Sequence, residues 1–147
     1  MTVVTVPTDL GPREAAAQLA AAHDPAWLAQ LTDELDRRLR AGGLERIMRR
    51  WSLSRAELGA LFGVSRQAVS KWLTSGVPGE RVEQVATVAA ITDLLERHVK
   101  ADRIPAVVRR RSPGLGDRSL LELVSQGHSS EALEFTRQMF TFTDVHA

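Results

Sequence analysis

The stretch Leu53-Ser-Arg-Ala-Glu-Leu-Gly-Ala-Leu-Phe-Gly-Val-Ser-Arg-Gln-Ala-Val-Ser-Lys-Trp-Leu73 carries the strongest structural signal in this 147-residue chain. Its apolar residues recur at helical spacing and predict two short helices, from about Ser54 to Phe62 and from about Arg66 to Thr74. Gly63 follows the first helix at once, where a residue without a Cβ permits a sharp turn. Ser65 is a good N-cap for the second helix. The stretch therefore predicts two helices joined by a tight turn.

The two faces of this predicted helix pair differ in chemistry. The expected inner face is apolar and consists of Ala56, Leu58, Leu61 and Phe62 on the first helix, Val64 in the turn, and Ala68, Val69 and Trp72 on the second. The opposite face of the second helix carries long or hydrogen-bonding side chains and no acid, namely Arg66, Gln67, Ser70 and Lys71. Such side chains suit phosphates and base edges. Gln67 suits adenine and Arg66 guanine, and the sequence leaves open which residue reads which base.

This stretch resembles the helix-turn-helix of the Xre, Cro and phage-repressor family. The matching residues are Leu53-Ser54-Arg55, Glu57-Leu58, Leu61-Phe62-Gly63-Val64-Ser65 and Gln67-Ala68-Val69-Ser70-Lys71-Trp72. The resemblance implies a lambda-repressor-like all-α domain whose second motif helix reads the major groove of double-stranded DNA through Arg66, Gln67, Ser70 and Lys71. It further implies phosphate contacts from Arg55, Ser65 and Thr74. The family usually has Gln where Arg55 stands, and arginine keeps the phosphate role and adds a charge.

Two other interpretations of the stretch stay open. It could be two core helices of an ordinary bundle, although such helices have no reason to combine a Gly-Val-Ser turn with an acid-free outer face. It could also be a helix-turn-helix that binds a protein instead of DNA.

The sequence before this motif predicts an arm and two helices. Residues 1–12 are expected to form an extended, flexible arm because Pro7, Gly11 and Pro12 interrupt the valines. Residues 13–43 are expected to hold a helix over 13–22 and a second over 26–40, which Asp24-Pro25 begins and Gly42-Gly43 ends. An apolar stripe on the second helix suits either the core or a dimer interface, and consists of Leu28, Leu31, Leu35 and Leu39.

The remaining helices complete a predicted all-α fold. Residues 44–103 are expected to form the helix-turn-helix domain, with one further helix over 44–51 and a long helix over 80–102. The expected core positions of the long helix are Val82, Val85, Ala89, Leu94 and Leu95. Residues 104–147 are expected to form a C-terminal helical segment for partner binding or dimerisation, with helices over 105–111, 119–126 and 130–140 and a turn over 112–117. No segment after Val6 alternates with the period of a strand.

The C-terminal segment is similar to the toxin-binding domain of Xre/MbcA/ParS-type antitoxins. The similarity rests on Pro113-Gly114-Leu115-Gly116-Asp117-Arg118-Ser119-Leu120-Leu121-Glu122-Leu123-Val124, followed by Gly127. Two departures weaken it: the usual proline near Leu120 is missing, and Val107-Val108 stands where that family has a tryptophan-leucine pair. The other interpretation is a turn and two helices that pack on the domain or on a second subunit.

The net charge of +1 averages over unlike regions. Residues 1–43 carry a net charge of −2, residues 44–81 a charge of +4 and residues 82–147 a charge of −1. The positive charge thus lies with the motif, as expected of a DNA-binding face. Arg109-Arg110-Arg111 suits either a solvated helix end or a secondary contact to DNA phosphates.

Several classes of function are not expected. The chain has no cysteine, which excludes disulfides, a cysteine nucleophile and thiolate metal sites. It has no apolar run of membrane-spanning length and no secretory signal, so we expect a cytoplasmic protein without a membrane partner. The four histidines show no metal-binding spacing, and no phosphate-binding loop is present. We therefore expect no enzyme activity, no metal and no cofactor.

The sequence as a whole predicts a sequence-specific DNA-binding transcriptional regulator, a repressor that acts by occluding its operator. Such proteins commonly act as homodimers on symmetric half-sites about 34 Å apart. One alternative is an antitoxin that binds DNA and neutralises a toxin protein through its C-terminal segment. A second alternative is a phage-type or partner-binding adaptor.

Overall fold

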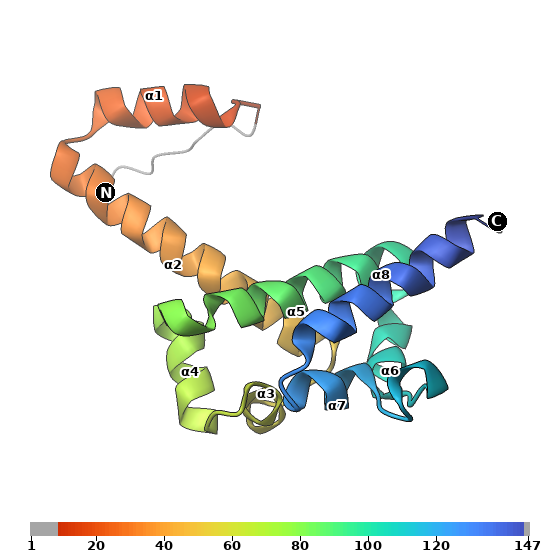
Figure 1. The fold of residues 1–147 in the computed structure, drawn as a ribbon. Coiled ribbons are helices and arrows are strands. Elements are labelled where there is room, and N and C mark those ends of the chain that lie inside the picture. Colours follow the sequence, from red (N-terminus) through yellow and green to blue (C-terminus); the bar gives the residue numbers. More distant parts are fainter. Residues whose placement is uncertain (1–8, 146–147) are drawn as a thin grey trace. The chain divides into compact units, whose positions relative to one another are not determined.

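The computed structural model describes residues 9–145, apart from the side chains of residues 37, 38, 40, 41 and 142–145. The regular elements are α1 (Pro12–Ala22), α2 (Pro25–Arg50), α3 (Arg55–Phe62), α4 (Arg66–Ser75), α5 (Gly79–His98), η1 (Ala101–Arg103), α6 (Ile104–Arg109), η2 (Pro113–Leu115), α7 (Leu120–Ser125) and α8 (Ser129–Val145) (Figure 1). The described residues contain no strand, only an isolated bridge between Ser112 and Arg118. The predicted all-α fold is confirmed. Most of the predicted N-terminal arm, residues 1–8, lies outside the described residues.

Contacts divide the chain into two units, Met1–Asp36 and Arg37–Ala147. In the first unit, α1 begins with Pro12 at its first position and buries none of its residues. Asp24 caps α2 as predicted, because its carboxylate accepts a hydrogen bond of 2.8 Å from the Trp27 amide. The rings of His23 and Trp27 stack with centroids 3.6 Å apart. α1 therefore contributes no buried residue to this unit, and the contacts described here lie where α2 begins.

The prediction that Gly42-Gly43 ends a helix is wrong, because α2 continues unbroken to Arg50. A glycine that ends a helix normally takes a positive φ, and neither of these glycines does. The next turns of α2 place Leu44 and Ile47 in the core with no exposed surface, so tertiary packing holds the helix together across the glycines. The sequence-based boundary after residue 43 therefore falls inside α2.

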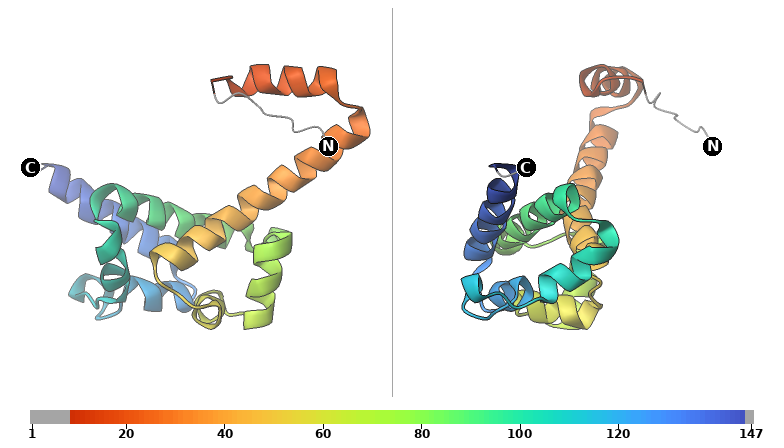
Figure 2. Two further views of the ribbon diagram at one scale, coloured as in Figure 1. Left: turned by 180° about the vertical axis from the view of Figure 1, so that it is seen from behind. Right: turned by 90° about the vertical axis from the view of Figure 1, so that its right-hand side faces the viewer.

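The second unit packs its helices around one continuous core. α5 and α8 lie side by side in every view, and α7 contacts α3, α6 and α8 (Figure 2). Fully buried side chains come both from the predicted domain and from the C-terminal segment, among them Leu44, Ile47, Trp51, Leu58, Val88, Ile91, Leu95, Ile104, Val108, Leu123 and Val124. Residues 104–140 are therefore packed into the same core as residues 44–103.

Local signals explain the boundaries of the later helices. α5 ends at His98, earlier than predicted, because Val99 is extended with φ −125° and ψ 139°. Pro105 lies in the first turn of α6, where its missing N–H costs nothing. α7 begins with a complete capping box between Ser119 and Glu122. The backbone N–H of Ser119 and the guanidinium of Arg111 both stabilise the ionised Glu122 carboxylate and lower its pKa.

Some predicted core positions lie at the surface. Ala56 is exposed, and Val82, in the first turn of α5, is 38% exposed. Leu28 and Leu31 are half-buried, whereas Leu35 and Leu39 are 50% and 77% exposed. The core interpretation of the leucine stripe is therefore wrong for its last two members. None of the described helices combines the length and the apolar composition that a bilayer crossing requires.

Candidate nucleic-acid interface

α3 and α4 are joined by only three residues, Gly63, Val64 and Ser65. Gly63 has φ 68°, the left-handed conformation that glycine adopts without steric cost. The hydroxyl of Ser65 accepts a hydrogen bond of 3.1 Å from the amide of Ala68 and caps α4. The predicted turn glycine and the predicted N-cap are both confirmed. Ser54 caps α3 in the same way, through the Glu57 amide at 3.1 Å.

A second glycine, Gly59, lets the three-residue connection between α3 and α4 lie against α3, and it was not among the residues predicted from the sequence. A Cβ on Gly59 would lie 2.6 Å from the carbonyl oxygen of Val64, closer than carbon and oxygen can approach. The Val64 amide donates a hydrogen bond of 2.8 Å to the Gly59 carbonyl. The only signal in the sequence is a glycine four residues before the turn glycine, on the buried side of the first helix.

The inner faces of the two helices fix their mutual position. Leu58, Leu61, Phe62, Val69 and Trp72 are at most 5% exposed, as predicted for all five. The rings of Phe62 and Trp72 lie 6.3 Å apart between centroids at an interplanar angle of 59°. α4 is thus anchored in the core by Val69 and Trp72, and Leu73 packs against the same core.

The opposite face of α4 carries the predicted base-reading side chains. Arg66, Gln67 and Lys71 are exposed, and Ser70 is half-buried. Within the described part of the chain, the side chains of Arg66, Gln67 and Lys71 make no hydrogen bond or ion pair. α4 contains no acidic residue from end to end. These side chains are therefore available to a ligand that accepts hydrogen bonds or carries negative charge.

The predicted phosphate-binding residues lie around this face and partly serve the protein itself. The guanidinium of Arg55, at the start of α3, donates a hydrogen bond of 3.0 Å to the Ser70 hydroxyl. The Thr74 hydroxyl donates to the Ser70 carbonyl at 3.0 Å. The Ser65 hydroxyl is occupied as an acceptor in the N-cap but keeps its proton for donation. The structure thus brings Arg55 and Ser70, which are fifteen positions apart, onto one surface.

The three arginines at 109–111 do not form one free cationic surface. The Arg109 guanidinium donates to the carbonyls of Trp51 (2.7 Å), Ser52 (3.0 Å) and Pro105 (2.9 Å). Two of these carbonyls, those of Trp51 and Ser52, directly follow α2, where no further helical turn supplies them with a partner. Arg111 pairs with the Glu122 carboxylate at 2.8 Å. Arg110 is exposed, with no ion pair to any described residue.

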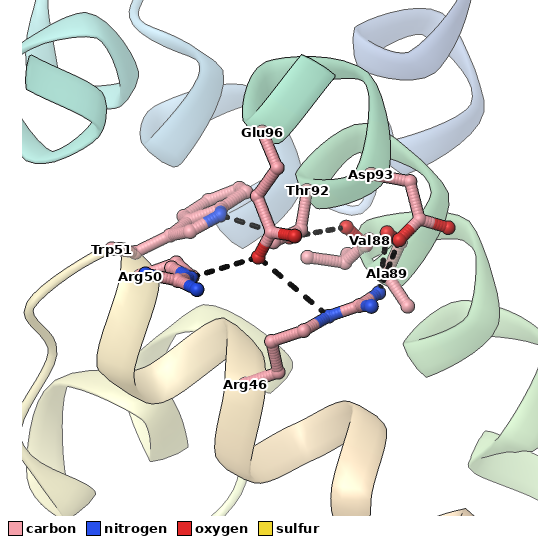
Figure 3. Close-up of polar contacts among 8 residues, drawn as sticks. All are labelled: Arg46, Arg50, Trp51, Val88, Ala89, Thr92, Asp93 and Glu96. Atoms are coloured by element: carbon pink, nitrogen blue, oxygen red, sulfur yellow. Dashed lines mark hydrogen bonds and ion pairs between the residues drawn. The ribbon is translucent and has the colours of Figure 1, made fainter. Parts of the chain in front are cut away.

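Two arginines of the basic segment are neutralised by α5 (Figure 3). Arg46 pairs with Asp93, and its other nitrogen lies 4.0 Å from Glu96. Arg50 donates to the same Glu96 carboxylate at 2.9 Å. Away from the outer face of α4, the positive charge of residues 44–81 is therefore smaller than the sequence count indicates. The charge that α3 and α4 present outward comes from Arg55, Arg66 and Lys71, with Glu57 against them.

The C-terminal segment contains a cavity of about 330 Å³. Its lining is mainly apolar and comes from α6, η2, α7 and α8 together with Val99, and it includes Leu115, Phe135 and Met139. Arg110 and Arg111 also line it. A cavity of this size and composition lies within the range typical of small-ligand and side-chain binding sites.

Comparison with known proteins adds no relative: no protein-family model matches this chain, and no curated protein matches it. Over the residues that the structure describes, no three histidine or carboxylate side chains gather as metal ligands would. A functional proposal thus depends on two features: the outer face of α4, and the packing of α4 against α3 that holds this face in position.

Proposed function

We propose that this chain is a sequence-specific DNA-binding transcriptional regulator of the helix-turn-helix type, and that it represses by occluding its operator. The observation that carries the proposal is the free, acid-free outer face of α4, held in place by the buried residues of α3 and α4. DNA is a polyanion, and a rigid cationic helix of this width fits its major groove. The proposal places the protein in the cytoplasm, with the chromosome, and assigns it no catalytic step.

In this mechanism α4 enters the major groove, with Arg66 and Gln67 in its first turn pointing at base edges. An arginine can bind guanine through two hydrogen bonds, and a glutamine can bind adenine in the same way. Ser70 and Lys71 lie one turn further along the same face. Arg55, Ser65 and Thr74 hold the flanking phosphates, which fix register and orientation without reading sequence. RNA polymerase is then excluded from a promoter that overlaps the site.

The experiment is a selection of bound sequences from random double-stranded DNA with the full chain, at low salt. The expected result is one enriched motif, whose affinity falls as salt rises because condensed counterions are released. The test variant combines Arg66→Ala, Gln67→Ala and Lys71→Ala, and should lose the enrichment. The matched control combines Arg97→Ala, Gln138→Ala and Lys100→Ala, exposed residues outside α3 and α4, and should keep it. Failure to enrich any sequence, or enrichment by the α4 variant, would contradict the proposal.

A second candidate function is that of an antitoxin, and the cavity in the C-terminal segment favours it. An apolar cavity whose lining includes arginines can receive an apolar side chain and an acidic neighbour from a partner protein. The test is co-expression with the product of any toxin-like gene directly beside this one. This function would be supported if the wild type rescued growth and Phe135→Ala did not, although the variant still bound DNA. A chain without such a neighbour, or without rescue, would not be an antitoxin of this kind.

A further inference from the structure

The exposed large apolar residues of the described chain fall into two groups. Trp27 and Leu35, 36% and 50% exposed, belong to the first half of α2 and to the unit Met1–Asp36. Leu39 and Val82, 77% and 38% exposed, belong to the second unit, where they line a common groove. Among the described residues, no other large apolar side chain is exposed to this extent. The exposed apolar surface is therefore concentrated in one groove, which Leu39 lines, and in one stripe, which consists of Trp27, Leu28, Leu31 and Leu35.

The groove lies between the middle of α2 and the first half of α5. It has a volume of about 310 Å³. Seven residues line it, and all of them are aliphatic or glycine; Leu39 and Gly43 come from α2, and Val82, Val85 and Ala89 from α5. A Cβ added to Gly43 would lie 4.0 Å from the Cβ of Ala89, so small residues face each other across the floor of the groove. A groove with a narrow apolar floor and no charged lining suits the leucine side chains of a helix.

The stripe carries apolar side chains of the kind that such a groove can accept. Trp27, Leu28, Leu31 and Leu35 recur at helical spacing over the first turns of α2. This pattern is the one by which amphipathic helices enter apolar grooves, through anchors three and four positions apart. Since Trp27 and Leu35 are exposed and Leu28 and Leu31 only half-buried, the stripe keeps apolar surface in contact with water.

The two units also carry opposite charge, which the region-by-region count from the sequence did not reveal. Residues 1–36 contain one base and six acids, a net charge of −5. Residues 37–147 contain eighteen bases and twelve acids, a net charge of +6. Two copies of the first unit repel each other, and so do two copies of the second. A first unit is attracted to a second unit.

We propose that the stripe of one copy docks into the groove of a second copy, and that the exchange is reciprocal. The stripe and one wall of the groove belong to the same unbroken helix, α2, and a helix cannot turn back onto its own next turns. The stripe that can enter the groove is thus the one on a second copy, and the opposite net charges of residues 1–36 and 37–147 favour this pairing. Because each copy supplies one stripe and one groove, a two-fold axis closes the pair as a dimer with two identical contacts.

The test measures the molar mass of the full chain by light scattering after size exclusion, without DNA. The wild type is expected to be a dimer that dissociates as salt rises, because salt screens the charges. Leu35→Lys breaks the stripe and Val82→Glu breaks the groove, and each variant alone should be monomeric because a charge would be buried. Both sites are exposed, so the helical content should stay unchanged. The matched control is Ala101→Glu, exposed in η1, which should remain dimeric.

Mixing the two variants separates this arrangement from all others. A Leu35→Lys chain keeps its groove, and a Val82→Glu chain keeps its stripe, so one contact is intact in the mixed pair. The second contact brings the new lysine to the new glutamate. The mixture should therefore form a heterodimer although neither variant dimerises alone. If Val82→Glu lost helicity, Leu39→Glu would break the same groove. A monomeric wild type, or a mixture that stays monomeric, would overturn the proposal, and neither outcome touches DNA binding.

Discussion

The indole nitrogen of Trp51 donates a hydrogen bond of 3.0 Å to the hydroxyl of Thr92, and both side chains are completely buried (Figure 3). The Thr92 hydroxyl donates in turn to the Val88 carbonyl, one turn back in α5, at 2.9 Å. Trp51 directly follows α2, at the point where the chain turns toward α3. The hydrogen bond therefore connects the segment that leads into α3 with the buried side of α5.

Thr92→Val should destabilise the protein by about 1–3 kcal/mol, because it leaves the buried indole N–H without an acceptor while keeping the side-chain volume. Thr92→Ser keeps the acceptor and loses one methyl group, so its cost should be smaller, about 0.8 kcal/mol. Urea denaturation followed by tryptophan fluorescence measures both free energies of unfolding. Equal stabilities of the valine variant and the wild type would show that the hydrogen bond contributes nothing.

Arg109→Ala should lower the free energy of unfolding by about 1–2 kcal/mol, since it removes the donors for the carbonyls of Trp51 and Ser52. The guanidinium is more than one-third exposed, so water replaces part of what is lost. Arg110→Ala is the matched control in the next position and should change stability by less than about 0.5 kcal/mol. The same urea experiment applies, and equal effects of the two substitutions would argue against the structural role of Arg109.

Gly59→Ala should destabilise the protein by about 1–3 kcal/mol, because the new methyl group would collide with the Val64 carbonyl and displace the turn. Gly42→Ala is the opposite case, since it lies within α2 with nothing near its Cβ position. There alanine should stabilise by up to about 1 kcal/mol through its higher helix propensity. Thermal denaturation of both variants provides the comparison. A stabilising effect of Gly59→Ala would contradict the close approach of α3 to the turn.

Gln67→Ala should cost about 1–3 kcal/mol of binding free energy on the selected operator and relax the preference at one base pair. The comparison is Arg55→Ala, which should weaken all DNA sequences alike and flatten the salt dependence. Fluorescence anisotropy on the operator and its single-base variants, at several salt concentrations, measures both effects.

Ser70→Ala keeps the charge of Arg55 while removing its hydrogen-bond partner, so it should leave the salt slope intact. If Gln67→Ala left specificity unchanged, the proposed orientation of α4 would be wrong.

Glu122→Gln should reduce stability near neutral pH and have no such effect in acid. The pKa of Glu122 is lowered in the folded state, first by the Ser119 backbone N–H and then by Arg111. A lowered carboxylate pKa stabilises the folded protein above the ordinary glutamate pKa, and this contribution disappears as pH falls through the lowered value. Glutamine can still complete the capping box, so the difference isolates the charge. The stability of both proteins is measured over the acidic range, and a pH-independent difference would count against this explanation.

Local patterns predicted the α3–α4 pair well. Gly63, Ser65, Val69 and Trp72 act through their own turn or their own helix face, over a few residues, and such signals can be recognised without knowing the fold. The opposite net charges of the two units were only partly visible in the sequence. The glycine pair Gly42-Gly43 suggests a division after residue 43, whereas the structure divides the chain after Asp36.

The sequence by itself determined that this chain is all-helical. It also determined the position of the glycine turn and of the cationic helix face that follows it. Helix periodicity and capping depend on neighbouring residues, so both can be recognised without the fold. Only the tertiary structure decided what happens to groups that meet from distant positions. Arg109 reaches Trp51 across 58 residues, and α2 continues through two glycines because Leu44 and Ile47 pack in the core. Partners so far apart leave no periodic trace, since their proximity results from packing and not from chain order.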